Sequence, residues 1–328
     1  MKIFNSWKMT LIILICLEFA IFGFLDSKFL DIDNLLYSVG DFLYIALAAL
    51  PMTLVIVTGG IDISVGATMG LSSIVTALLW YSGMNIWVAL FCGLVSGGLA
   101  GLLNGWLILL TRVNPLVITL GSSFLLSGVA LILSGLAGAT GFEGISGLPE
   151  SFSNIANGMI FNIPNPVWIL LFFALIFYGI LHMTKFGRYL FLLGTNPEAA
   201  KYSGFDTIKL TIATYMIMGV GAACSGIMLT SYFTSARADL GSDSPLSVIT
   251  CVVLGGASIY GGRGSIVNTL LASFLIGYLK YGLQMIRVSS EATNIYLGLL
   301  LITVIAGRHF WGEYANYRKN VRVLHVAK

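Results

Sequence analysis

Long apolar stretches alternate with short polar intervals along nearly the whole chain of 328 residues. A helix needs about 20 apolar residues to cross a bilayer. Two stretches, 65–81 and 245–260, are marginal by this measure, so counts of eight and nine spans stay open beside ten. The pattern predicts an all-helical transmembrane bundle whose spans lie near 9–25, 36–57, 65–81, 86–110, 115–137, 167–183, 208–231, 245–260, 265–282 and 292–307.

The composition supports this assignment. Hydrophobic residues make up 57% of the chain and charged residues only 9%, whereas a soluble domain usually carries about a quarter charged residues. No stretch outside the predicted spans is long enough for a separate folded domain, so we expect one transmembrane domain over 1–328. Lys2 and Lys8 before an apolar run resemble a signal peptide, but no small-residue cleavage site follows. We therefore expect an uncleaved first span.

The distribution of basic residues predicts the orientation. With the N-terminus in the cytoplasm, 13 of the 17 Lys and Arg residues fall in cytoplasmic segments and only 4 fall outside. Cytoplasmic loops carry the excess of Lys and Arg in membrane proteins, so both termini are predicted to be cytoplasmic. The longest outer loop is then 138–166, which is poor in positive charge. It is either an irregular cover or a docking surface, and its sequence alone does not decide between them.

The polar interval 185–209, KFGRYLFLLGTNPEAAKYSGFDTIK, separates two long apolar stretches. Asn196 can cap a helix, Pro197 suits the first helical position and Glu198 is favourable near the positive end of the helix dipole. Gly204 can end this helix. A short cytoplasmic helix between two spans is a natural contact for a soluble partner. A solvated connector is the alternative, and local sequence alone favours it.

Two glycine-rich breaks follow apolar runs and share the pattern GGxxIxxG, at 59–66 and 255–262. Non-helical backbone at membrane depth is tolerated where it is buried in protein or lines a watery cavity. Interrupted spans therefore indicate a transport pathway, although ordinary cytoplasmic turns are the alternative. The pathway candidates are Gly59, Gly60, Asp62, Ser64, Gly66, Gly255, Gly256, Gly261 and Gly262.

Glycines recur at every fourth position at Gly93, Gly97, Gly101 and Gly105. A four-residue step returns to nearly the same helix face, so this face lacks side chains and lets another helix approach closely. We expect it to serve helix packing.

Polar groups at membrane depth are few. Glu18 and Asp62 are candidates for function because burying a carboxylate is costly, although Glu18 could instead be protonated or reach a membrane edge. Asn104, Asn268 and Gln284 suit either bonds between helices, which we favour, or contacts with a hydroxyl-rich solute. The histidines have no ligand spacing, and GxSxG, HExxH and GxxxxGK[ST] are absent from the sequence. We therefore predict no catalytic site, no metal site and no bound cofactor.

Several motifs together resemble the sugar-type permeases of bacterial ABC importers, the relatives of ribose, arabinose and xylose permeases. They are GGIDISVG at 59–66, NPLVITLG at 114–121, GRYLFLLGTNPEAAKYSG at 187–204, ARADLG at 236–241 and VVLGGASIYGGRGSI at 252–266. The resemblance covers nearly the whole chain, in the family's order and spacing. Three further stretches, at 50–64, 136–147 and 231–241, resemble the permeases of autoinducer-2 importers in particular.

The resemblance implies a permease that works with partner chains in the inner membrane. A periplasmic binding protein would deliver the solute, and a second, related permease subunit would complete the pathway. Two ATPase subunits, which bind ATP and Mg, would drive transport. By the same analogy the helix at 196–204 seats in a groove of the ATPase, which reverses the preference for a mere connector. The coupling residues are Gly194, Asn196, Pro197, Glu198, Ala199, Ala200 and Gly204.

Other functions remain as alternatives at this stage. A permease for a pentose or deoxyhexose would show the same motifs, because specificity in this family is expected largely from the binding protein. An ion-coupled secondary transporter is a remote alternative, since such carriers usually have more buried charge. An intramembrane enzyme or sensor is more remote still.

Overall fold

The computed structural model describes residues 2–139, 143–289, 292–293, 295–300 and 302–303. The described chain is almost wholly helical, and its one small sheet pairs β1 (Met159–Ile160) with β2 (Ile163–Pro164). The predicted all-helical fold is confirmed. The helices are α1 (Lys2–Leu25), η1 (Ser27–Leu30), α2 (Ile32–Val57), α3 (Val65–Tyr81), α4 (Ile86–Thr111), α5 (Pro115–Leu136), α6 (Glu150–Asn157), α7 (Asn165–Tyr178), η2 (Gly179–Met183), α8 (Lys185–Thr195), α9 (Pro197–Tyr202), α10 (Thr207–Phe233), α11 (Ser244–Leu254) and α12 (Ile266–Met285).

Seven helices in the described part of the chain are long and apolar enough to cross a membrane: α1, α2, α4, α5, α7 continued by η2, α10 and α12. The two stretches that the sequence marks as marginal form the shorter apolar helices α3, of 17 residues, and α11, of 11 residues. The predicted tenth span, 292–307, is helical at its described residues up to 303, and the rest lies outside them.

The prediction of a helix over 245–260 is wrong at its C-terminal part. α11 ends at Leu254, and the chain turns at once through Gly255 and Gly256. Gly256 has a φ of +92°, in the left-handed region that residues with a β-carbon rarely adopt. The apolar residues beyond it therefore belong to the second break and not to the span.

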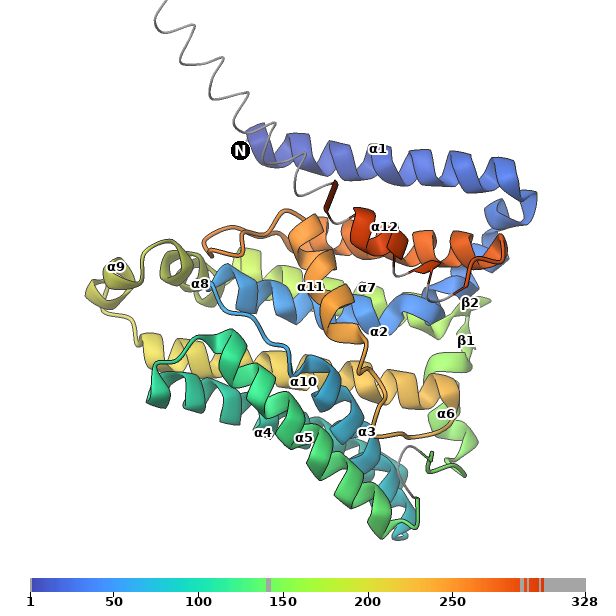
Figure 1. Ribbon diagram of the computed structural model, residues 1–328, viewed down its shortest axis with the longest axis horizontal. Coiled ribbons are helices and arrows are strands. Elements are labelled where there is room, and N and C mark those ends of the chain that lie inside the picture. The colour runs from blue at the N-terminus through green and yellow to red at the C-terminus, as the bar shows by residue number, and fades with distance from the viewer. Residues whose placement is uncertain (1, 140–142, 290–291, 294, 301, 304–328) are drawn as a thin grey trace, which may run out of the picture.

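Two helices form the centre of the bundle. In α2, 83% of the apolar window is buried inside the protein, and in α10 67%, against 17% for α1 at the periphery. α2 packs against α10, α12, α11 and α7, while α10 packs most extensively against α4. Figure 1 shows the long helices running along the molecule, with α8 and α9 at one end and α6, β1 and β2 at the other.

The glycine face of α4 lies against α10 and α3. A β-carbon on Gly97 would come within 2.5 Å of the carbonyl oxygen of Gly219, and one on Gly101 within 2.1 Å of that of Tyr215. Gly105 meets α10 in the same way, and Gly93 lies against Ser72 and Thr76 of α3. The backbones of α4 and α10 therefore touch where small residues allow it.

In its described residues, 138–139 and 143–166, the loop contains one helix and one short hairpin. The Oγ of Ser231 donates to the carbonyl oxygen of Phe152 at 2.7 Å, and Nδ2 of Asn157 donates to that of Ser231 at 3.0 Å. These bonds hold α6 on the C-terminal end of α10. This part of the loop is thus regular and fixed to the bundle, so the irregular form is wrong for α6, while a docking role for the loop stays a prediction.

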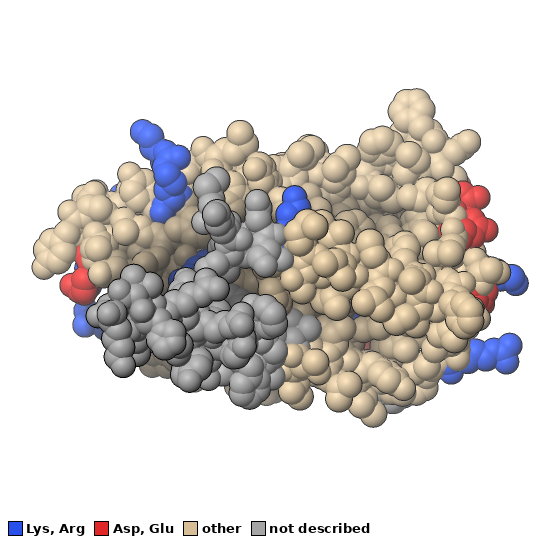
Figure 2. Space-filling model, turned by 90° about the horizontal axis from the view of Figure 1, so that it is seen from above, with Lys and Arg blue, Asp and Glu red and all other residues tan. Residues whose placement is uncertain are grey.

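Charged residues lie mostly at the two ends of the bundle (Figure 2). Lys185, Arg188, Lys201 and Lys209 lie on α8, α9 and the start of α10. Acidic side chains gather at the opposite end, on the right in Figure 2, together with some basic side chains. The charge difference that predicts the orientation is therefore a difference between the two ends of the bundle.

Candidate functional site

The interval 185–209 contains two short helices, α8 and α9, and the first residues of α10, whereas the sequence predicts only the helix at 196–204. Thr184 begins α8, with its Oγ1 accepting from the backbone N–H of Gly187 at 3.2 Å. Thr184 lies just outside the interval, which is why the local pattern did not reveal this cap. In α9, Oδ1 of Asn196 accepts from the N–H of Ala199 at 3.0 Å, and Gly204 follows with a φ of +75°. α9 therefore has the N-cap and the glycine stop that the sequence indicates.

α9 protrudes at the end of the bundle, on the left in Figure 1. The ring of Tyr189 in α8 stacks on that of Phe205 behind α9, with 3.6 Å between the ring centroids. Glu198 pairs with Lys201 at 3.1 Å, but their side chains are 70% and 61% exposed, so the pair adds little to stability. The exposed carboxylate of Glu198 is accessible to a partner.

Asp206 connects this region to the central helix α10. Its carboxylate accepts from the backbone N–H groups of Lys209 and Ile208, and pairs with the Lys209 ammonium at 3.2 Å. These interactions, with the bond from the Lys209 backbone the largest, lower the pKa of Asp206 from its usual value. The carboxylate therefore stays ionised and caps α10 at neutral pH.

The C-terminal end of α8 meets both glycine breaks in one place, which we call the glycine junction: Gly59, Gly194, Gly261 and Gly262. The N–H of Gly262 donates to the carbonyl oxygen of Val57 at 2.8 Å. A β-carbon on Gly194 would lie 1.9 Å from that same oxygen and 2.5 Å from the nitrogen of Gly262. The backbone of α8 thus lies tightly between the end of α2 and the second break.

Gly261 completes the junction. Its φ is +86°, and a β-carbon there would lie 2.8 Å from the carbonyl oxygen of Gly194 and 3.0 Å from the nitrogen of Gly59. Three segments far apart in the chain therefore share one contact with no side chain between them. A displacement of α8 would act directly on the end of α2 and on the loop between α11 and α12, because close-packed backbone transmits strain.

The first break carries a buried polar cluster around Asp62, which is 2% exposed. Ser64 donates to Oδ1 of Asp62 from both its backbone N–H, at 2.9 Å, and its Oγ, at 2.6 Å. Asn104 of α4 donates from Nδ2 to the Ser64 Oγ at 2.8 Å. The prediction that Asn104 bonds between helices is confirmed. The carboxylate is held by hydrogen bonds inside the protein.

Two residues at this break were missed by the sequence analysis. Thr119 of α5 accepts from the N–H of Ile63 at 3.1 Å and so satisfies the non-helical backbone. The Oη of Tyr215 in α10 lies close to Gly60, so that a β-carbon on Gly60 would come within 2.5 Å of it. Neither had a local signal, because each lies on a helix remote in sequence.

The second break is held by α1. Trp7 donates from Nε1 to the carbonyl oxygen of Leu254 at 2.9 Å, and its ring lies 2.9 Å from the position of a β-carbon on Gly256. At the tip, Tyr260 is 94% exposed. The two breaks thus differ: the first is anchored around a buried carboxylate, and the second presents an aromatic ring at the surface.

The remaining candidates lie at tight helix contacts. A β-carbon on Gly66 would lie 2.3 Å from the carbonyl oxygen of Gly241, and one on Gly255 2.8 Å from the nitrogen of Thr269. Their role in a pathway stays a prediction. Glu18 in α1 is buried, and within the described residues neither of its carboxylate oxygens has a hydrogen-bond partner; the same is true of Nδ2 of Asn268.

Comparison with known proteins identifies the family. Residues 34–305 match the model of the family described as the branched-chain amino acid transport system / permease component. The chain belongs to this permease family. The resemblance to sugar-type ABC permeases is thereby confirmed, and the protein is a multi-pass transport subunit of the inner membrane.

Individual relatives match over nearly their full length. The autoinducer 2 import system permease protein LsrD of Yersinia pestis (strain Pestoides F) is 47% identical over 303 residues, which cover 92% of this chain and 91% of the relative. LsrD of Yersinia pseudotuberculosis serotype O:1b (strain IP 31758) matches with the same identity and coverage. No solved structure matches this chain.

Proposed function

We propose that this permease imports autoinducer-2 across the inner membrane as part of a binding-protein-dependent ABC importer. The observation that carries the proposal is the 47% identity to LsrD proteins over 92% of this chain and 91% of theirs. The partners are a second, related permease subunit, two ATP-binding subunits and a periplasmic solute-binding protein. ATP and Mg bind to the partner ATPase subunits.

In this proposal α9 binds in a groove of the ATPase, and the glycine junction transmits the movement of α8 and α9 to the two breaks. α9 is exposed and capped at both ends, so α8 and α9 can move together as one rigid body. Gly194 at the end of α8 contacts the backbone of Val57, where α2 ends just before the first break, and of Gly262 in the second break. Closure of the ATPase subunits would then shift the breaks together and switch access to the pathway from one side to the other.

The first experiment measures uptake of labelled autoinducer-2 and labelled ribose in cells from which the gene is deleted and then restored, with the binding protein and ATPase intact. Loss and recovery of autoinducer-2 uptake alone is expected. If ribose uptake alone follows the gene, the solute is a pentose or deoxyhexose and the permease role stands. Uptake that survives loss of the ATPase and collapses with an uncoupler would instead support an ion-coupled carrier.

Replacement of Glu198 by alanine is expected to reduce uptake by about tenfold or more while membrane insertion stays normal. An exposed substitution of this kind usually changes stability by less than about 0.5 kcal/mol, so a transport defect would reflect the lost partner contact. Gly204→Ala should act similarly, because its φ of +75° is strained for a side chain although nothing lies within 4 Å. The readouts are uptake and ATP hydrolysis per assembled complex.

Lys201→Gln is the matched control for Glu198→Ala, since it removes the same ion pair and keeps the carboxylate. The control should retain most uptake. Equal defects in both variants would trace the effect to the ion pair, and normal ATP-dependent uptake by Glu198→Ala and Gly204→Ala would refute the coupling role of α9.

A further inference from the structure

A polar cavity opens at the end of the bundle away from α9. It has a volume of about 380 Å³, within the range of about 300–1,000 Å³ that is usual for small-molecule sites. Residues of α2, of α6 and the hairpin, and of the ends of α10 and α12 enclose it. We call it the α2–α10 cavity; the residues used below are Tyr37, Asp41, Asn157, Tyr232 and Tyr281.

The lining combines one carboxylate with aromatic rings and amides. Asp41 accepts at Oδ1 from the Oη of Tyr232 at 2.5 Å, which leaves Oδ2 for another donor. Within the described residues Asp41 forms no ion pair. Tyr37 and Tyr281 add two further rings. Carboxylate oxygens accept from hydroxyl groups, and flat rings offer apolar faces to the C–H groups of a small polyol.

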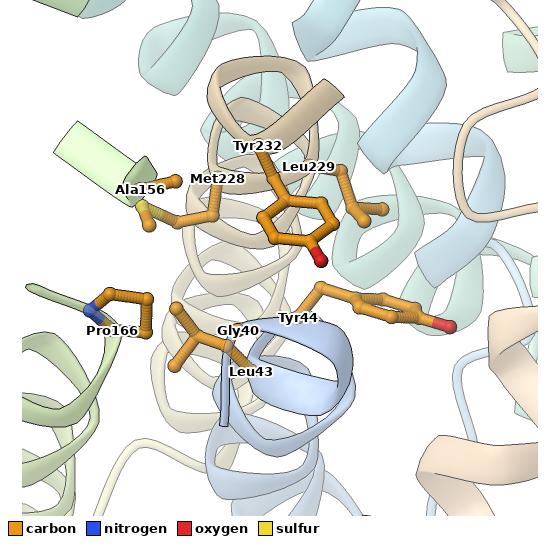
Figure 3. Close-up of a pocket in the computed structure, with 8 residues that line it drawn as sticks. All are labelled: Gly40, Leu43, Tyr44, Ala156, Pro166, Met228, Leu229 and Tyr232. Atoms are coloured by element: carbon orange, nitrogen blue, oxygen red, sulfur yellow. The ribbon is translucent and has the colours of Figure 1, made fainter. Parts of the chain in front are cut away.

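A smaller apolar pocket lies directly beneath this cavity. Gly40, Ala156, Pro166 and Tyr232 line both spaces, and Leu43, Met228 and Leu229 face the inner one. Figure 3 shows the ring of Tyr232 reaching from α10 toward α2, above Tyr44. The Tyr232 ring therefore borders both the outer cavity and the apolar pocket, between the two central helices.

Hydrogen bonds between α6 and α10 hold the roof of the cavity. Asn157 donates to the carbonyl oxygens of Ser231 and Tyr232, at 3.0 and 3.3 Å, and Oγ of Ser231 accepts from the N–H of Ala156 at 3.0 Å. α6 is thus fixed to the end of α10, beside Tyr232. Preorganised walls lower the entropic cost of binding a small molecule.

We propose that the α2–α10 cavity is a solute-binding subsite of the permease itself, for a small, neutral, hydroxyl-rich molecule. Asp41 accepts from a solute hydroxyl and the tyrosine rings contact its C–H faces. The bond that Tyr232 donates to Oδ1 holds the carboxylate in place, so that Oδ2 accepts from the solute. The inference rests on the proposed function, and it places part of the solute selectivity in this chain and not only in the binding protein.

The test compares Asp41→Asn and Tyr232→Phe with Asp33→Asn in the complete importer, supplied with saturating solute-loaded binding protein. Asp33 is an exposed acid on the same end of α2 that does not line the cavity. Uptake per assembled complex should fall at least about fivefold in both cavity variants, as expected for a lost hydrogen bond to a charged group. The control should keep wild-type uptake, and the affinity of the complex for the binding protein should be unchanged throughout.

Wild-type uptake by both cavity variants would overturn the subsite. A fall in binding-protein affinity that accounts for the lost uptake would also overturn it, because Asp41 would then belong to a protein docking surface. The variants are assayed on whichever labelled solute the wild-type importer takes up, autoinducer-2 or ribose. Failure of the wild type on autoinducer-2 therefore counts against the proposed function alone, and the variant comparison still judges the subsite.

Discussion

Gly194→Ala is expected to lower uptake by at least about tenfold. The added β-carbon would lie 1.9 Å from the carbonyl oxygen of Val57 and 2.5 Å from the nitrogen of Gly262. Both are backbone atoms, so no side chain can turn aside to make room. Overpacking of this kind costs roughly 1–3 kcal/mol, and relief requires α8 to move away from one or both breaks. The hydrogen bond between Gly262 and Val57 is the first contact at risk.

The measurement is uptake per assembled complex, together with ATP hydrolysis stimulated by the loaded binding protein. Gly179→Ala is the matched control, since it adds the same methyl group close to α8 and meets nothing within 4 Å. If the glycine junction transmits motion, Gly194→Ala hydrolyses ATP without matching transport and the control behaves as wild type. Full uptake by Gly194→Ala would show that transport tolerates a movement of α8 away from the breaks. The glycine junction would then have no role in coupling ATP hydrolysis to transport.

Gly101→Leu is expected to destabilise the bundle itself. The β-carbon would lie 2.1 Å from the carbonyl oxygen of Tyr215 and 2.8 Å from its carbonyl carbon, at the most extensive helix contact in the protein, α4 with α10. The two helices must separate to admit the side chain. We expect a loss of at least about 1–3 kcal/mol and a clear fall in the amount of protein in the membrane.

Thermal unfolding of the purified protein in detergent measures this effect, with Gly128→Leu as the control. Gly128 lies in α5 and has nothing within 4 Å of an added β-carbon, so the same substitution there should leave the unfolding temperature nearly unchanged. Equal losses in both variants would mean that leucine in a span, and not the α4–α10 contact, lowers stability.

Local features of the structure could be predicted because their causes lie within a few residues. Asn196 and Gly204 cap α9 through bonds and dihedral angles set by their own neighbours. The four-residue glycine spacing in α4 defines a bare face whichever helix meets it. The second helix of the interval, α8, was missed because its cap, Thr184, falls at the end of the preceding apolar run.

The chain by itself determined a polytopic helical membrane protein, the two marginal spans, the short capped helix and the two glycine breaks, because each depends on composition, period or local backbone preference. The permease role came from the resemblance of its motifs to a known family. Only the tertiary structure decided what these features meet. Gly59, Gly194 and Gly261 lie in three segments separated by more than sixty residues each, and Asp41 meets Tyr232 across 191 positions. Such contacts follow from how α2, α8 and α10 pack, and packing is a property of all the helices together.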